Sequence, residues 1–304
     1  MKNIFSIILS FLVIFTLQAQ KLDLKLNLKQ GETYYQKMNT NMNIDQTING
    51  MANNITMSIR GVTEFKVTNK TDSFYFMDVV YASLAMDMKM PMATMSFDSE
   101  KKDSTDIFSK ILRNLIGKSM QIKMDYKGKV FYVKNADSIF NGMFENIPNL
   151  PESQRKQLED QMKQSYGEEA FRNSIEMSVS LFPEKPVALK ETWEKNSDIK
   201  TTMELNLKSK YKLEESNKNF YRITGSTEMS SNKDKYVSVS GFSMKYDMNG
   251  TMTSDVKIDT NTGWVIESNI SQNLDGNVDI EASDSLPDGL SFPMKMKSEI
   301  KLSN

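Results

Sequence analysis

The sequence predicts a mainly antiparallel β protein, a β-rich α+β fold in which long strands form a curved sheet or an open barrel. Three observations lead to this fold class. Apolar and polar residues alternate with period two over long stretches, the alternating stretches recur in both halves of the chain, and helical spacing appears only between them. Period-two alternation is typical of strands with one buried and one solvated face.

The N-terminus has the features of a secretory signal peptide. Lys2 precedes an apolar run at residues 4–17, and small or polar residues follow it. We expect residues 1–19 to be removed by cleavage after Ala19. The alternative is a membrane anchor, but 14 residues fall short of the roughly 20 that span a bilayer. The mature chain has no other apolar run long enough to span one. Because there is no cysteine to lipidate, we expect an exported, periplasmic or extracellular protein without a lipid anchor.

Residues 20–134 are expected to form a first β-rich half. Residues 22–28 alternate strictly and predict a half-buried strand. Residues 74–81 are apolar at almost every position, which predicts a central or doubly covered strand. Two further runs each place their apolar residues on one face; these residues are Tyr34, Met38, Met42 and Ile44 in one run, and Ile55, Met57, Ile59, Phe65 and Val67 in the other.

Residues 181–304 are expected to repeat this half. A shift of 146 positions, 203 minus 57, lays Met57 on Met203, and the same shift lays Phe65 on Tyr211. It also aligns the Phe-Tyr pairs at 74–75 and 220–221, and two Asp-to-Gly turns follow downstream at 125–128 and 259–263. Landmarks that recur in the same order predict an internal duplication.

Helical spacing interrupts the alternation between the halves. Asp106 with the two hydroxyl residues before it could cap a short helix at residues 107–116. Residues 135–180 are expected to form a helical insert, in which Pro151 begins a polar helix that extends to about Tyr166. Pro148 and Pro151 within the insert and Pro183 and Pro186 after it interrupt the regular structure.

Composition excludes most catalytic and metal chemistry. The 304 residues include no cysteine and no histidine, which removes thiolate nucleophiles, imidazole bases and the commonest zinc ligands. Lys and Arg number 38 against 39 Asp and Glu and are not clustered, so no nucleic-acid partner is expected. We expect a non-catalytic protein without a cofactor, and a carboxylate-based hydrolase remains the weakest alternative.

Methionine is the unusual residue type, with 23 copies. On one strand Met86, Met88, Met90 and Met92 would share a face. Such a face is typical of the flexible lining of an apolar binding surface. The alternative is a thioether site for Cu(I). Trp193 and Trp264 lie among repeated aromatic landmarks and complete the set of expected ligand-lining residues.

Several phrases together resemble an uncharacterised family of exported bacterial envelope proteins, a domain of unknown function. The phrases are Gly31-Glu32-Thr33-Tyr34, Phe182-Pro183-Glu184-Lys185-Pro186-Val187 with Glu191-Thr192-Trp193, and Asp259 with Gly263-Trp264-Val265. Lys190 stands where the second phrase usually has glycine. The resemblance covers nearly the whole mature chain, and it implies no activity and no catalytic residue.

The sequence therefore predicts an envelope protein that binds an apolar small molecule, a lipid or a protein partner on a Met-rich sheet face. Methionine-based Cu(I) binding is the alternative.

Overall fold

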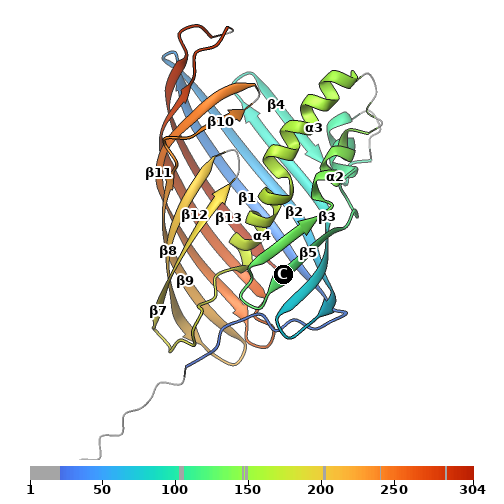
Figure 1. Ribbon diagram of the computed structural model, residues 1–304, viewed down its shortest axis with the longest axis vertical. Coiled ribbons are helices and arrows are strands. Elements are labelled where there is room, and N and C mark those ends of the chain that lie inside the picture. Colours follow the sequence, from blue (N-terminus) through green and yellow to red (C-terminus); the bar gives the residue numbers. More distant parts are fainter. Residues whose placement is uncertain are drawn as a thin grey trace, which may run out of the picture.

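The computed structural model describes residues 21–102, 106–145, 147, 150–200, 203–239, 241–284 and 286–304. The expected signal peptide at residues 1–19 and the residues before Asp106 in the expected helix cap lie outside this part. The mainly antiparallel β fold is confirmed: the strands form one 13-stranded sheet in which neighbouring strands pair antiparallel (Figure 1).

The strands and helices follow one another along the chain with these bounds. The strands are β1 (Thr33–Ile48), β2 (Met51–Lys70), β3 (Phe74–Met90), β4 (Ala93–Asp98), β5 (Met120–Asp125), β6 (Val130–Lys134), β7 (Thr192–Lys200), β8 (Glu204–Ser216), β9 (Phe220–Ser231), β10 (Tyr236–Val239), β11 (Phe242–Asp259), β12 (Val265–Ile280) and β13 (Leu290–Ser303). The helices of the described residues are α1 (Ile107–Arg113), α2 (Ala136–Asn141), α3 (Glu152–Tyr166) and α4 (Glu168–Val179), with a 3-10 turn, η1 (Gly142–Phe144), after α2.

The two halves of the chain occupy the sheet in the same strand order. The order is β6-β5-β3-β2-β1, then β13, then β12-β11-β9-β8-β7. Backbone hydrogen bonds also match: Gly31 N–H donates to Val67, and Lys190 N–H donates to Leu213, 146 positions after Val67. Gly31 and Lys190 both have positive φ, 87° and 69°. An internal duplication would produce the same strand order in both halves, as observed. The duplication itself stays a prediction.

The sheet bends into a trough and does not close. Its terminal strands, β6 and β7, are joined by the helical segment instead, since α4 contacts both of them. In Figure 1, α3 and α4 lie along the side where the two edges of the sheet stay apart. The helices at residues 135–180 therefore bridge the gap that the sheet leaves. No helix in the described part of the chain is long and apolar enough to cross a membrane.

Residues 21–32 close the lower end of the trough, blue in Figure 1. Leu24, Leu26 and Leu28 are 0–2% exposed, so their inward alternation was predicted correctly. The predicted strand at residues 22–28 is wrong, however, because this backbone bonds to turns: Leu26 N–H donates to Tyr126 and Asn27 N–H donates to Thr262. An isolated bridge from Leu22 to Val187 is the one strand-like pairing here.

Strand β3 is central, but only one of its faces is covered. Tyr75, Met77 and Val79 are buried on the inner face, whereas Phe74 and Phe76 remain partly exposed outside. The prediction of a central strand is confirmed, because β3 has β2 on one side and β5 on the other. The ring of Phe74 packs edge-on against Phe131, and the Lys123 ammonium lies 3.8 Å from its centroid.

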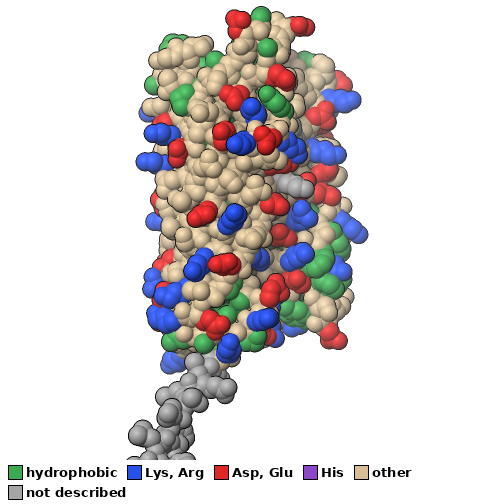
Figure 2. Space-filling model, turned by 60° about the vertical axis from the view of Figure 1, so that its left-hand side comes forward, with side chains coloured by type: hydrophobic (Ala, Val, Ile, Leu, Met, Phe, Trp, Pro, Cys, Tyr) green, Lys and Arg blue, Asp and Glu red, His purple; other side chains and the backbone are tan. Residues whose placement is uncertain are grey.

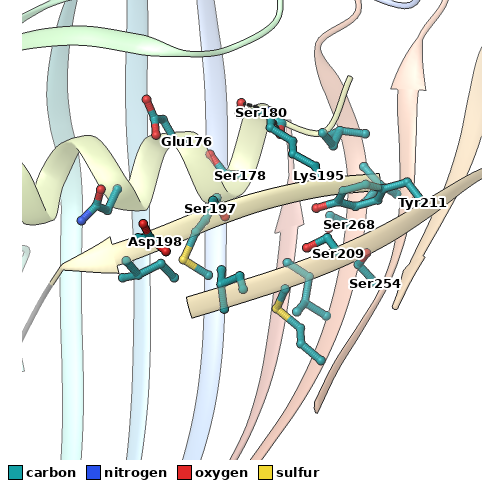
Figure 3. Close-up of a pocket in the computed structure, with 18 residues that line it drawn as sticks. Glu176, Ser178, Ser180, Lys195, Ser197, Asp198, Ser209, Tyr211, Ser254 and Ser268 are labelled. Carbon is teal, nitrogen blue, oxygen red and sulfur yellow. Dashed lines mark hydrogen bonds between the residues drawn. The ribbon is translucent and has the colours of Figure 1, made fainter. Parts of the chain in front are cut away.

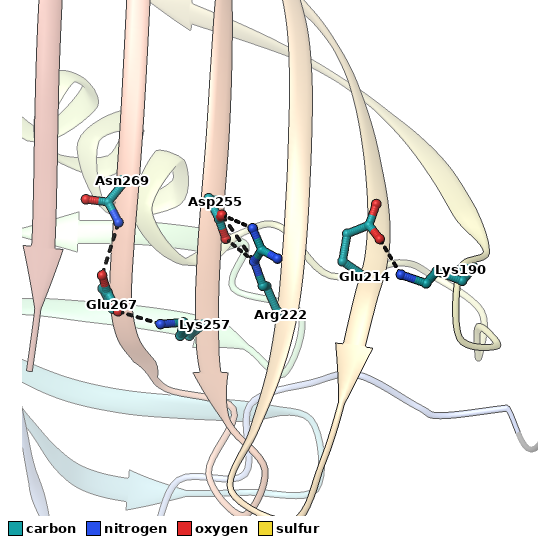
Figure 4. Close-up of polar contacts among 7 residues, drawn as sticks. All are labelled: Lys190, Glu214, Arg222, Asp255, Lys257, Glu267 and Asn269. Carbon is teal, nitrogen blue, oxygen red and sulfur yellow. Dashed lines mark hydrogen bonds and ion pairs between the residues drawn. The ribbon is translucent and has the colours of Figure 1, made fainter.

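The outer face of the sheet is charged. Figure 2 shows Lys, Arg, Asp and Glu side chains scattered over the side that lies to the left in Figure 1. Near the lower end the charges form ion pairs, among them Lys257 on β11 with Glu267 on β12 at 2.9 Å, and Lys190, in the turn before β7, with Glu214 on β8 at 2.6 Å (Figure 4). Arg222 on β9 pairs with Asp255 on β11. Opposite charges placed directly across strands stabilise the pairing modestly.

These ion pairs predict a loss of stability in acid. Hydrogen bonds from Lys190 and then Lys212 lower the pKa of the Glu214 carboxyl from 4.5 to about 2. A lowered folded-state pKa gives stability that is present above pH 4.5 and lost as the pH falls toward 2, because the unfolded chain takes up the proton first. Glu214→Gln should flatten this decline, measured as the urea midpoint between pH 5 and pH 2. An unchanged slope would contradict the ion-pair explanation.

A second prediction concerns the turn that receives the N-terminal segment. Gly263 has φ +68°, and a Cβ there would lie 2.2 Å from the carbonyl oxygen of Lys25. Gly50 has a similar φ, +76°, but open space around it. Gly50→Ala should therefore cost about 1–2 kcal/mol of unfolding free energy. Gly263→Ala should cost about 1–3 kcal/mol more through steric crowding. Equal losses in urea denaturation would show that residues 21–32 do not pack tightly against this turn.

Candidate ligand-binding site

One row of paired residues crosses the inner face of the trough from β4 to β7. Directly paired residues in an antiparallel sheet have their side chains on the same face, so the row can be followed from strand to strand. In order, it consists of Met95, Met88, Met57, Met42, Ser298, Gln272, Met252, Thr227, Ser209 and Lys195. We call this set the inner row. It begins with four methionines and ends with two hydroxyls and an ammonium.

The methionine end of the inner row is only partly covered. Met42, Met57, Met88 and Met95 are all partly exposed although they point into the trough. The apolar row above it, which includes Ile44 and Met296, is partly exposed as well. The inner face in this region therefore presents unbranched, polarizable side chains to an incompletely filled interior, a surface that adapts to ligands of irregular shape.

The polar end of the inner row belongs to a pocket between the end of α4 and strands β7, β8, β11 and β12 (Figure 3). Apolar and hydroxyl-bearing residues line it together. The apolar ones include Leu181, Leu207, Met252, Val256 and Ile270, and the hydroxyl-bearing ones are Ser178, Ser180, Ser197, Ser209, Tyr211, Ser254 and Ser268. A mostly apolar wall with a few convergent polar groups is typical of small-molecule sites.

Lys195 supplies the positive charge of this pocket. Its ammonium donates to the carbonyl oxygen of Ser180 at 2.6 Å and to the Ser180 hydroxyl at 2.5 Å. Ser180 is the C-cap of α4, where the negative end of the helix dipole favours a cation. Burial lowers the pKa of the Lys195 ammonium, and the more distant carboxylates of Glu184 and Glu176 oppose this shift.

Buried hydroxyls continue from Lys195 along the inner row. Ser209, 6% exposed, and Thr227, 2% exposed, share a hydrogen bond of 2.9 Å. Ser298 is also buried and donates to the Gln272 side chain at 3.2 Å. These polar groups lie at one level on successive strands, where aliphatic side chains are more usual, and they are hydrogen-bonded in pairs.

Of the four methionines expected on one strand, Met86, Met88 and Met90 lie on β3 and share a face, and Met92 does not lie on the strand. Strand β3 ends at Met90, and Met92 lies in the following turn with 98% of its surface exposed. Met86 pairs with Ile59 and Phe97 on the inner face. The methionines that come together do so across strands, because Met88 lies between Met57 and Met95.

The two tryptophans have different positions. Trp264 is buried at the lower end, where its indole N–H donates to the carbonyl of Tyr35 and its ring packs on Tyr34 and Phe65. Trp193 is partly buried and stacks on Tyr211, which lines the pocket. Sequence reasoning overlooked Lys195, although it lies two residues after Trp193 and so on the same strand face.

The described residues contain no group of three or more acidic, histidine or cysteine side chains that could hold a metal ion. Methionine thioethers are not among these side chains.

Comparisons with known proteins identify a matching family and solved structures with distant similarity. Residues 72–265, more than half of the chain, match the family of unknown function DUF6263. A comparison with curated proteins gives no match. Among solved structures, a lipovitellin chain from a study of lipid–protein interactions has 9% identity and a TM-score of 0.45, over 91% of this chain and 25% of that one. This chain thus spans about a quarter of the lipovitellin chain's length.

Two outer membrane proteins are more distant. The COG4313 channel of Pseudomonas putida F1 has 6% identity and a TM-score of 0.23, over 91% of this chain and 97% of that one. A loop-deleted OmpT of Vibrio cholerae has 9% identity and a TM-score of 0.19, over 90% and 100%. The family match rests on the strands β3 to β11 and the helical insert between them, and it shows that the chain belongs to DUF6263, a family of unknown function.

Proposed function

We propose that this protein is a non-catalytic, exported binding protein that holds an apolar ligand against the inner face of its sheet. The observation that carries the proposal is the partly exposed apolar surface inside the trough, which lies behind a charged outer face. The leader at residues 1–19 supports export, and the lack of cysteine and histidine supports a role without catalysis.

The distribution of apolar surface favours a ligand over simple core packing. The lower part of the trough is filled by leucine, tyrosine and tryptophan side chains that are 0–3% exposed, such as Leu28, Tyr75 and Trp264. The methionine end of the inner row lacks such a cover. Each apolar side chain that a ligand removes from water adds about 25 cal/mol per Å² to binding, so an alkyl or aromatic ligand would stabilise this region.

The proposal predicts that a charge on the inner face abolishes binding of an apolar probe. Purified mature protein should bind the neutral fluorophore N-phenyl-1-naphthylamine with a blue-shifted emission. Met57→Lys should weaken that binding at least tenfold, about 1.4 kcal/mol, because it places an ammonium among Met42 and Met88.

Thr56→Lys is the matched control, since Thr56 neighbours Met57 on the exposed outer face of β2. It should leave the probe affinity unchanged. Equal affinities for the two variants, or no binding by the wild-type protein, would contradict the proposal. Thermal unfolding of both variants verifies that each is folded.

One observation favours a second function, Cu(I) binding. Met88 has a methionine directly across each of its two neighbouring strands, Met57 on β2 and Met95 on β4. Cβ atoms of directly paired residues lie about 4.5–5.5 Å apart, so three thioethers could converge on one soft ion.

Leucine substitutions separate this function from the first. The double variant Met57→Leu, Met88→Leu keeps the apolar surface but removes two thioethers, so it should bind N-phenyl-1-naphthylamine normally and lose Cu(I) affinity in a bathocuproine competition. Met51→Leu serves as control, because Met51 is 71% exposed at the start of β2. If the double variant keeps the copper affinity of the wild type, the methionines do not form a copper site.

A further inference from the structure

The inner row has opposite chemical characters at its two ends. Four methionines form the end on β1 to β4, and Ser209, Thr227 and Lys195 form the end on β7 to β9. Within the row, Gln272 and Ser298 separate Met252 from the methionines. Apolar pairs on the same face, Leu274 with Met296 above and Ile270 with Ile300 below, connect the two ends. A ligand that fits this surface has one polar group and a long apolar remainder.

Lys195 has capacity for an anion. An ammonium has three N–H donors, and two of them are used by Ser180. In the described part of the chain no carboxylate forms an ion pair with it. Glu176, the carboxylate on the neighbouring turn of α4, accepts a hydrogen bond from the Val130 N–H instead, and Asp198 is exposed at the pocket's margin. The partly buried charge therefore has no ion-pair partner among the described residues.

We propose that Lys195 binds the anionic headgroup of an amphipathic ligand, an alkyl chain with a single carboxylate or phosphate group. This inference rests on the proposed function, because the same inner face would hold the alkyl chain. The headgroup would lie at the ammonium beside Ser209 and Ser254, and the chain would extend past Met252 toward the methionines of the first half.

The structure explains why this placement is favourable. A cation in a pocket with apolar walls loses much of its hydration, and an anion inside the same pocket restores a partner for it. The hydroxyls of Ser254 and Ser268 line the pocket and add donors for headgroup oxygens. The simpler explanation is that Lys195 only caps α4 through Ser180, so the experiment must separate charge from capping.

Lys195→Gln makes that separation. Glutamine keeps an N–H donor for Ser180 but has no charge. The probes are oleate and its uncharged counterpart oleyl alcohol, measured by displacement of N-phenyl-1-naphthylamine at pH 8, with oleyl phosphate as a third probe. The control is Lys208→Gln, which removes a lysine from the exposed outer face of β8.

Wild-type protein and Lys208→Gln should bind oleate at least tenfold more tightly than oleyl alcohol. Lys195→Gln should lose this preference while its affinity for oleyl alcohol stays the same, and Lys195→Arg should keep the preference. Tighter binding of oleyl phosphate than of oleate would identify the headgroup as phosphate, and the reverse order as carboxylate.

The failures are distinguishable. If wild-type protein binds oleate and oleyl alcohol equally, or if Lys195→Gln weakens both alike, the headgroup site is wrong and the apolar site stands. If the wild-type protein binds none of the three probes, the proposed function itself is wrong. If Lys195→Gln fails to fold, Ser254→Asp replaces it, because this variant keeps Lys195 and its bonds to Ser180 and places a carboxylate in the pocket. It should abolish the preference for oleate over oleyl alcohol, and a preserved preference would overturn the headgroup site.

Discussion

The structure depends on strict alternation along strands that are long enough to bend the sheet into a trough. Because successive side chains point to opposite faces, β1, β2, β12 and β13 place their charged side chains outside and most aliphatic and methionine side chains inside. Gln272 and Ser298 are polar exceptions on the inner face. A sheet with one apolar face must cover that face with something. No second sheet in the described part of the chain does so. Instead the sheet bends, and its apolar face lies on the inside of the trough.

Different segments cover the inner face at the lower end, along the open side and farther up the trough. At the lower end, the N-terminal segment buries Leu24, Leu26 and Leu28. The hydroxyl of Tyr75 accepts a hydrogen bond from the Leu28 N–H and donates one to the Leu26 carbonyl, so these two backbone groups have partners. Along the open side, α4 connects the terminal strands. Farther up the trough, methionines line a face that no segment of the described chain covers fully. The proposed binding function rests on this incomplete cover, and Lys195 would provide the charged end of the site.

Much of the fold follows from local rules that act within a single strand. Alternation at Met57, Ile59 and Phe65 fixed the inward face of β2 correctly, and the helical spacing after residue 135 located the insert. The errors arose where a partner distant in sequence decides the outcome. Residues 22–28 alternate as a strand does, but their hydrogen bonds go to turns near Tyr126 and Thr262.

The candidate site was harder to predict for the same reason. Sequence spacing grouped Met86, Met88, Met90 and Met92 along one strand, whereas the register groups Met88 with Met57 and Met95 across three. Spacing within one strand does not determine how β7 pairs with β8. The position of Lys195 directly opposite Ser209 could therefore not be predicted from spacing alone.

Native mass spectrometry of the mature protein, purified without detergent and incubated with a total lipid extract, tests the central claim most directly. The claim predicts a species heavier than the polypeptide by the mass of one lipid, lost after extraction with organic solvent. If only the bare polypeptide mass is found, the trough does not hold an apolar ligand and its methionines serve packing alone.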